Sequence, residues 1–431
     1  MSRKKVEAGD EVEIILKDGT RYKGILMPRP ALYKDDHVVL KLPNGYNIGI
    51  EKKKVKEIKL VKKYEEKKAK KEKTKKNPSL PNVLLISCGG TISSRVDYRT
   101  GGVYADYTAE DFVAMCPELA EIANIDAKQL MQIMSEDMNH EEWIKIAEAV
   151  FDALQRYDGV VVTQGTDTLH YTTAALSFFL RNIGKPVIVT GAQRSIDRPS
   201  SDAFMNLICS VIAAKSDLAG VYCCMHGTIN DDFCYLLRGT KVRKMHTSRR
   251  DAFRPINDLP MAKIFPSGKL ELIQSCPKRT NNIGKLEAFF EPKVALVYVY
   301  PGMDPEIISF YRKKKFKGLV LAATALGHVP TSKKRYSLIP ELKKAIADGM
   351  IVVIASQTLY GRVHPYVYTN LRKLSMELGC VFASDMLPEA AYIKLGWLLG
   401  KYRDKEKIKE LMQYNFAGEI NDRHLPDMFL F

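Results

Sequence analysis

The chain begins with short runs in which apolar and polar residues alternate. Residues 12–16 and 21–26 alternate in this way, and the Asp18-Gly19 pair between them is typical of a β-hairpin turn. Further short runs occupy residues 36–42, 47–50 and 55–61. This spacing of short strands and turns predicts a small SH3-like or Sm-like β-barrel over residues 1–61.

From residue 82 onward the pattern changes to continuous apolar runs separated by helical periodicity. Residues 83–86 and 160–162 are aliphatic throughout, as in strands of a parallel sheet that are buried on both faces. Residues 141–156 carry apolar side chains at helical spacing. The alternation predicts a two-domain α/β fold with a doubly wound parallel sheet. We place its larger domain over 82–270, a connector over 271–292 and its smaller domain over 293–431.

Charge is concentrated between the predicted barrel and the predicted α/β part. The net charge is +16, and residues 62–76 alone carry nine lysines against three glutamates. This composition predicts a solvated linker over residues 62–81. The other interpretation is an electrostatic contact with a polyanion such as RNA.

Composition argues against several classes of protein. No apolar stretch approaches the roughly 18 to 20 residues of a membrane span, and the polar start has no apolar core for a secretion signal. The eight cysteines include no Cys-x-x-Cys pair and no paired histidine spacing for zinc. We therefore expect a cytoplasmic protein with reduced thiols, no metal site and no membrane contact.

Two cassettes of glycine and threonine come directly after two of the predicted strands. Gly89-Gly90-Thr91-Ile92 follows the first run, and Gly165-Thr166-Asp167-Thr168 follows the second. Ligands of such sheets bind beyond the carboxyl ends of the strands, so both threonine hydroxyls are candidates for nucleophilic chemistry. A lysine oriented by an aspartate could take the proton, but the residues alone do not single out one lysine. The alternative is that the threonines and the aspartate only cap the helices that follow.

Four motifs resemble the bacterial-type L-asparaginase family in order and approximate spacing. They are Cys88-Gly-Gly-Thr-Ile92, Ser135-Glu-Asp-Met138, Gln164-Gly-Thr-Asp-Thr168 and Thr190-Gly-Ala-Gln-Arg194. Within that family the predicted barrel is typical of the D subunits of archaeal glutamyl-tRNA(Gln) amidotransferases. This chain also resembles those D subunits at three further stretches. They are Tyr300-Pro-Gly-Met-Asp-Pro305, Gly327-His-Val-Pro330 and Asp385-Met-Leu-Pro-Glu389.

The resemblance implies roles for individual residues. Thr91 matches the nucleophile, Tyr104 the group that supports its hydroxyl, and Thr166, Asp167 and Lys244 the second catalytic group. Ser135 and Asp167 resemble the contacts to the α-carboxylate and α-amino groups of the substrate, while Gly165 and Ala192 offer backbone groups near the scissile amide. Glu136 occupies a substrate-binding position at which asparaginases commonly have glutamine.

The resemblance also implies a function and partners. It implies a glutaminase subunit that releases ammonia from glutamine through a threonine acyl-enzyme. A GatE-type E subunit would use that ammonia, with ATP and Mg²⁺, to convert Glu-tRNA(Gln) into Gln-tRNA(Gln). This chain would need no cofactor and would form a homodimer within an α2β2 assembly.

Two alternatives remain beside this function. The first is a free-standing L-asparaginase or glutaminase. The extra barrel argues against it, and so does His328, a position at which many asparaginases have asparagine. The second is an RNA-binding scaffold on an inactive hydrolase fold. The presence of the complete catalytic set argues against that scaffold.

Overall fold

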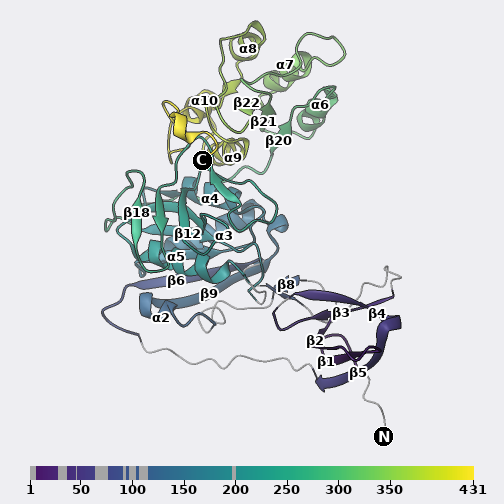
Figure 1. The fold of residues 1–431 in the computed structure, drawn as a ribbon. Coiled ribbons are helices and arrows are strands. Elements are labelled where there is room, and N and C mark those ends of the chain that lie inside the picture. The colour runs from purple at the N-terminus through teal and green to yellow at the C-terminus, as the bar shows by residue number, and fades with distance from the viewer. Residues whose placement is uncertain are drawn as a thin grey trace.

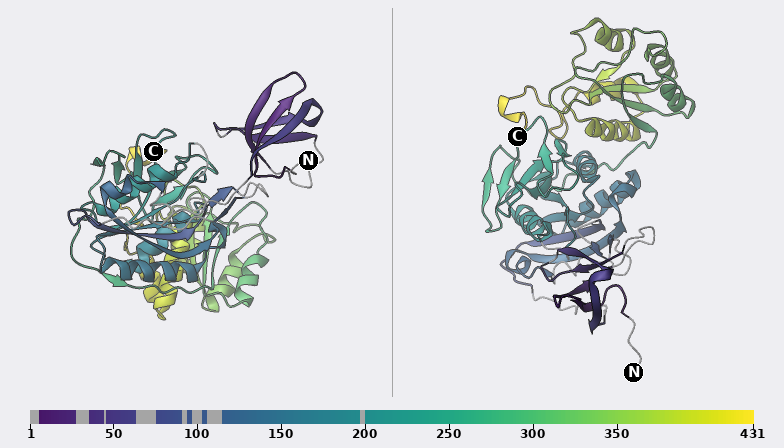
Figure 2. Two further views of the ribbon diagram at one scale, coloured as in Figure 1. Left: turned by 90° about the horizontal axis from the view of Figure 1, so that it is seen from below. Right: turned by 45° about the vertical axis from the view of Figure 1, so that its right-hand side comes forward.

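The computed structural model describes residues 6–27, 36–44, 46–63, 76–90, 115–196 and 200–431, and the backbone alone of residues 94–96 and 103–105. Along the chain these residues form an N-terminal β unit, a large α/β unit and a smaller C-terminal α/β unit (Figure 1). Figure 2 shows the N-terminal unit standing to one side of the α/β body.

The N-terminal unit is a five-stranded antiparallel sheet in the order β4-β3-β2-β1-β5. Alternate residues of β1 point into its core, where Val12 and Ile14 are fully buried with Leu40. The strands are β1 Glu11–Leu16, β2 Arg21–Leu26, β3 His37–Lys41, β4 Asn47–Glu51 and β5 Val55–Lys62. The hairpin and the strands expected from the alternating pattern are therefore present.

The large α/β unit is built on an eight-stranded sheet in the order β18-β17-β14-β13-β12-β10-β6-β9. Strands β9, β6, β10, β12 and β13 are parallel, and β14, β17 and β18 extend the sheet with antiparallel pairs. The strands are β6 Asn82–Gly89, β9 Asn124–Ile133, β10 Gly159–Thr163, β12 Pro186–Thr190, β13 Gly220–His226, β14 Cys234–Arg238, β17 Ala262–Ile264 and β18 Leu270–Leu272.

The strand order contains a topological switch point between β6 and β10. From β6 the chain continues to β9 on one side, and it then returns to β10 on the other side before adding β12 and β13 outward. At such a point the loops beyond the carboxyl ends separate, and ligands of doubly wound sheets bind there. The two cassettes follow β6 and β10, so both lie at this switch point.

Helices cover both faces of the large sheet. Helices α3 (His140–Leu154) and α4 (Leu169–Phe179) cover one face, and α2 (Leu119–Ile122) and α5 (Ala203–Lys215) cover the other. In β6, Ile86 packs in the first of these cores and Leu85 in the second, and both are buried. Burial on both faces explains why the strands are aliphatic without alternation.

The C-terminal unit has a four-stranded parallel sheet in the order β20-β21-β22-β23. Helix α9 (Pro388–Lys401) packs between this sheet and α4, where Phe178 and Trp397 stack with ring centroids 5.6 Å apart. The remaining elements are β20 Val294–Tyr298, β21 Gly318–Ala323, β22 Ile351–Ser356, β23 Val381–Phe382, α6 Glu306–Lys313, α7 Ile339–Ala347, α8 Thr369–Arg372 and α10 Lys405–Met412. One apolar core thus joins the two α/β units.

These observations confirm the expected architecture, a β-rich N-terminal unit followed by a two-domain α/β fold with a doubly wound sheet. The pattern did not indicate that β14, β17 and β18 join the main sheet, because their short runs resemble isolated hairpins. None of the helices in the described ranges has the length and apolar character that a membrane crossing would require.

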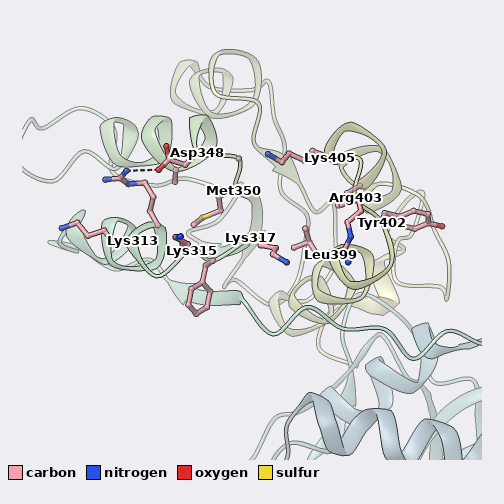
Figure 3. Close-up of a pocket in the computed structure, with 14 residues that line it drawn as sticks. Lys313, Lys315, Lys317, Asp348, Met350, Leu399, Tyr402, Arg403 and Lys405 are labelled. Carbon is pink, nitrogen blue, oxygen red and sulfur yellow. Dashed lines mark hydrogen bonds and ion pairs between the residues drawn. The ribbon is translucent and has the colours of Figure 1, made fainter.

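A cavity of about 680 Å³ lies at the amino-terminal edge of the C-terminal sheet (Figure 3). Its lining includes six basic side chains, Arg312, Lys313, Lys315, Lys317, Arg403 and Lys405. Helices α6, α7 and α9 all end at this edge, and basic residues at helix C-termini offset the negative end of the helix dipole. The end of α6 accounts for Arg312 and Lys313, and we assign the cavity no ligand.

Candidate active site

The two glycine cassettes meet backbone to backbone. Gly90 has a φ of +80°, and a Cβ built on it would lie 2.0 Å from the nitrogen of Gly165. A Cβ on Gly165 would lie 2.7 Å from the Cβ of Ser135. Glycine is therefore required at both positions, and its absence of a side chain brings the loops after β6 and β10 together with the Ser135 turn.

We expect Gly90→Ala to destabilise the fold by roughly 3 kcal/mol, because it combines a strained left-handed backbone with a clash against Gly165. Gly302→Ala is the matched control, since Gly302 has a φ of +79° with no atom within 4 Å of its Cβ position. Urea unfolding of both variants measures the difference. Equal losses of stability would show that the two cassettes do not pack this closely.

Lys244 joins the second cassette through two hydrogen bonds. Its Nζ donates to Thr166 Oγ1 at 2.8 Å and to Asp167 Oδ1 at 2.7 Å. The Lys244 side chain is 10% exposed and that of Asp167 is 67% exposed, so the pair spans from the interior to the surface. Lys244 ends the short strand β15 (Val242–Lys244), which pairs with β16 (Phe253–Pro255).

The hydrogen bonds of Thr168 and Asp167 test the alternative that these side chains only cap α4. The side chain of Thr168, which precedes α4, makes no cap hydrogen bond to the helix. Its hydroxyl instead donates to the backbone oxygen of Ser135 at 2.7 Å, and the Asp167 carboxylate accepts from Lys244. These side chains therefore connect loops rather than cap α4.

The loop after β12 also contacts Thr166. The Thr166 hydroxyl lies 3.4 Å from Gln193 Oε1, and a Cβ on Gly191 would lie 3.0 Å from Thr166 Cγ2. The buried carboxylate of Asp202 accepts the backbone N–H of Gln193 at 2.9 Å and of Arg194 at 3.0 Å. Asp202 thus fixes the loop that contains Ala192.

The structure brings together most of the residues that the sequence motifs singled out. Thr166, Asp167 and Lys244 are in direct contact, and Ser135 and Gly165 lie beside them. Ala192 is buried in the loop after β12, and Glu136 is exposed in the 3₁₀ turn Ser135–Asp137. Thr91 lies outside the described residues. The backbone of Tyr104 belongs to β8 (Val103–Ala105), opposite Arg95 of β7 (Ser94–Val96).

His170 is a buried residue beside the site that the sequence did not indicate. Burial, with the positive charges of Arg243 and Lys244, lowers the pKa of His170 from 6.5 to about 3. Its Nδ1 has no hydrogen-bond partner among the described residues. Its position in an apolar helix resembles an ordinary core position, so no local signal distinguishes it.

This arrangement is suited to acyl transfer. A lysine bonded to a threonine hydroxyl, and oriented by a carboxylate, can exchange a proton with that hydroxyl. The backbone at Gly90, Gly165 and Gly191 converges on the same place. Backbone N–H groups are the usual donors to the oxyanion of such reactions.

Models of known families match almost the whole chain. The model described as "Asparaginase, N-terminal" matches residues 82–278, and that of the "Glutaminase/Asparaginase C-terminal domain" matches residues 293–412. A third model, the "GatD N-terminal domain", matches residues 6–61. The matched ranges follow the three structural units.

Several relatives that match nearly the whole chain bear the name of the D subunits of glutamyl-tRNA(Gln) amidotransferases. The protein from Pyrococcus furiosus is 49% identical over 437 aligned positions, which cover 100% of this chain and 98% of the relative. That from Thermococcus kodakarensis is 45% identical with the same coverage.

Solved structures of asparaginases resemble the α/β part. The thermostable L-asparaginase from Thermococcus kodakarensis is 32% identical with a TM-score of 0.71, covering 79% of this chain and 100% of that protein. L-asparaginase I from Vibrio cholerae is 28% identical with a TM-score of 0.68, covering 80% of this chain and 100% of that protein.

Proposed function

Because the chain belongs to the GatD family, the D subunits of glutamyl-tRNA(Gln) amidotransferases within the asparaginase family, we propose that it is a glutaminase subunit. It releases ammonia from glutamine, and a GatE-type E subunit uses the ammonia to convert Glu-tRNA(Gln) into Gln-tRNA(Gln). The single observation that best supports a hydrolytic role is the contact of Lys244 with Thr166 and Asp167 at the switch point of the sheet.

The proposed reaction passes through an acyl-enzyme. The Thr91 hydroxyl attacks the carbonyl carbon of the glutamine side-chain amide, the C–N bond breaks, and the hydroxyl proton leaves with ammonia. Water then cleaves the ester, which releases glutamate and restores the hydroxyl. Lys244 and Thr166 exchange the protons while Asp167 orients the lysine, and Tyr104 supports Thr91.

The proposed substrate contacts surround this group. Ser135 and Asp167 hold the α-carboxylate and α-amino groups, with Glu136 at the same turn. The backbones of Gly165 and Ala192 lie near the scissile amide, and the buried positions of both residues leave little room for bulk water there. Excluding water strengthens each polar contact with the reacting amide.

The proposed assembly divides the chemistry between two chains in the cytoplasm. This chain supplies ammonia as a homodimer within an α2β2 complex, and it requires no cofactor for that step. The E subunit holds ATP and Mg²⁺ and provides most of the contacts to the tRNA.

A free-standing L-asparaginase is the second candidate, because solved asparaginases cover about 80% of this chain. The uncovered part includes the N-terminal β unit, which matches the GatD N-terminal model. That match favours the amidotransferase role over the free enzyme.

Ammonia release from glutamine and from asparagine distinguishes the two candidates. We expect the purified chain to hydrolyse glutamine, and the rate to rise when the E subunit and Glu-tRNA(Gln) are added together. Vigorous asparagine hydrolysis by the chain alone, unchanged by those additions, would overturn the proposed amidotransferase role.

A further inference from the structure

The strand that carries Lys244 is not fixed by either main sheet. Strand β15 has three residues, and among the described strands it pairs with β16 alone, in a two-stranded sheet of its own. Ladder hydrogen bonds of so small a sheet give little rigidity by themselves. The position of the Lys244 amine must therefore depend on contacts elsewhere.

The first of these contacts lies immediately before β15. Lys241 is completely buried, and its Nζ donates to Asp385 Oδ2 at 2.6 Å and to the Asp385 backbone oxygen at 3.3 Å. Asp385 is also completely buried and accepts from the Asn421 backbone N–H at 3.1 Å. His424 Nε2 lies 3.0 Å from the same Asp385 oxygen as Lys241. The Asp385 carboxylate thus has three polar partners from two segments of the chain.

The second contact lies within β15. The Arg243 guanidinium, beside Lys244, forms an ion pair with Glu389, whose side chain is 5% exposed. The pair is a charge contact without aligned hydrogen-bond geometry, because Arg243 Nη1 has no hydrogen bond. Arg243 Nη2 also lies 3.5 Å from the Tyr298 hydroxyl at the end of β20. Both ion pairs of this segment therefore lead to the C-terminal unit.

We propose that Asp385 and Glu389 are positioning residues that hold the Lys244 amine on Thr166 by anchoring β15 through Lys241 and Arg243. This inference rests on the proposed amide hydrolysis. Asp385 lies three residues before α9 and Glu389 lies in its first turn, and α9 is packed firmly against α4 of the catalytic unit. In this way the C-terminal unit sets the position of Lys244 through β15.

The buried charges are better suited to fixing geometry than to raising stability. Well-packed apolar residues usually stabilise a fold as much as a buried ion pair does, because burial removes the hydration of both charges. An ion pair, however, fixes the partners at one short distance. A displacement of about 1 Å at a catalytic group lowers rates by roughly a hundredfold.

The test compares Glu389→Gln, Asp385→Asn and the double variant Arg243→Gln/Glu389→Gln in the complex with the E subunit. Glu291→Gln is the matched control, since Glu291 is an 11% exposed carboxylate just before β20 that pairs with Lys317, away from β15. The measurements are kcat and KM for glutamine, thermal unfolding, and the rate at which an amine-reactive ester modifies Lys244, mapped by mass spectrometry.

We expect kcat to fall about 10- to 100-fold in each anchor variant, with KM within about threefold of wild type. Modification of Lys244 should become about tenfold faster, because the amine leaves its two partners. The double variant has no unpaired charge and should regain thermal stability but not kcat. The control should match wild type in kcat and labelling.

Three results would overturn the positioning role. These are kcat values equal to that of Glu291→Gln, unchanged labelling of Lys244, or recovery of kcat together with stability in the double variant. Failure of the proposed function itself is distinct, because the wild-type complex would then release no ammonia from glutamine while the labelling still reports on the anchor.

Discussion

Replacement of Lys244 by methionine is expected to lower ammonia release from glutamine by roughly a thousandfold or more, with the fold retained. Methionine keeps the unbranched stem but removes the amine that contacts Thr166 and Asp167. No other described residue donates a hydrogen bond to Thr166 Oγ1 in its place. Initial rates at saturating glutamine and a thermal melt measure the two quantities.

The same loss should follow Thr166→Ala, and the double variant should be hardly worse than either single one. Groups that act as a unit are strongly non-additive, because removal of one disables the others. Lys285→Met provides the control, an exposed lysine on the two-residue strand β19 (Lys285–Leu286). Multiplicative losses in the double variant would mean that Lys244 and Thr166 act independently, and a loss in the control would mean that methionine itself disturbs the chain.

The hydrophobic pattern of the sequence was sufficient to predict the part of the site that lies at the ends of β6 and β10. The aliphatic runs at β6 and β10 identify buried parallel strands, and the glycines that follow identify loops of close approach. The structure places Gly90 against Gly165 as that pattern requires. These features can be predicted from the sequence because each depends on residues that are adjacent in the chain.

Lys244 illustrates the limit of local pattern. It belongs to a three-residue strand in a chain with 66 lysines and arginines, so only the resemblance to the asparaginase family selected it. Its contact with Thr166 joins residues 78 positions apart. The periodicity of hydrophobic residues does not predict contacts between residues so far apart in the sequence.

The buried charges of the anchor were missed for a related physical reason. Lys241 and Asp385 are 144 positions apart, and each resembles a surface residue by type, because charged side chains are rarely buried without a partner. Their burial follows only from the tertiary packing that brings these two loops together. His170 was missed likewise, because a histidine within an apolar helix gives no sign of the charges packed beside it.

His170 should make folding stability depend on pH between about 6.5 and 3. In the folded chain burial, together with Arg243 and Lys244, lowers the pKa of His170 from 6.5 to about 3. Below pH 6.5 the unfolded chain therefore binds a proton that the folded chain does not. Stability is lost as the pH falls through this window, by about 1.4 kcal/mol per pH unit from this residue.

His170→Gln removes this titration with little change in volume, so its free energy of unfolding should fall less steeply on acidification. Relative to wild type, the variant should gain about 2 kcal/mol between pH 6 and pH 4.5. Urea unfolding at several pH values measures the difference, with the exposed His364→Gln as control. If the two slopes coincide, the folded chain accepts a proton at His170 despite burial. A third positive charge would then lie beside Arg243 and Lys244.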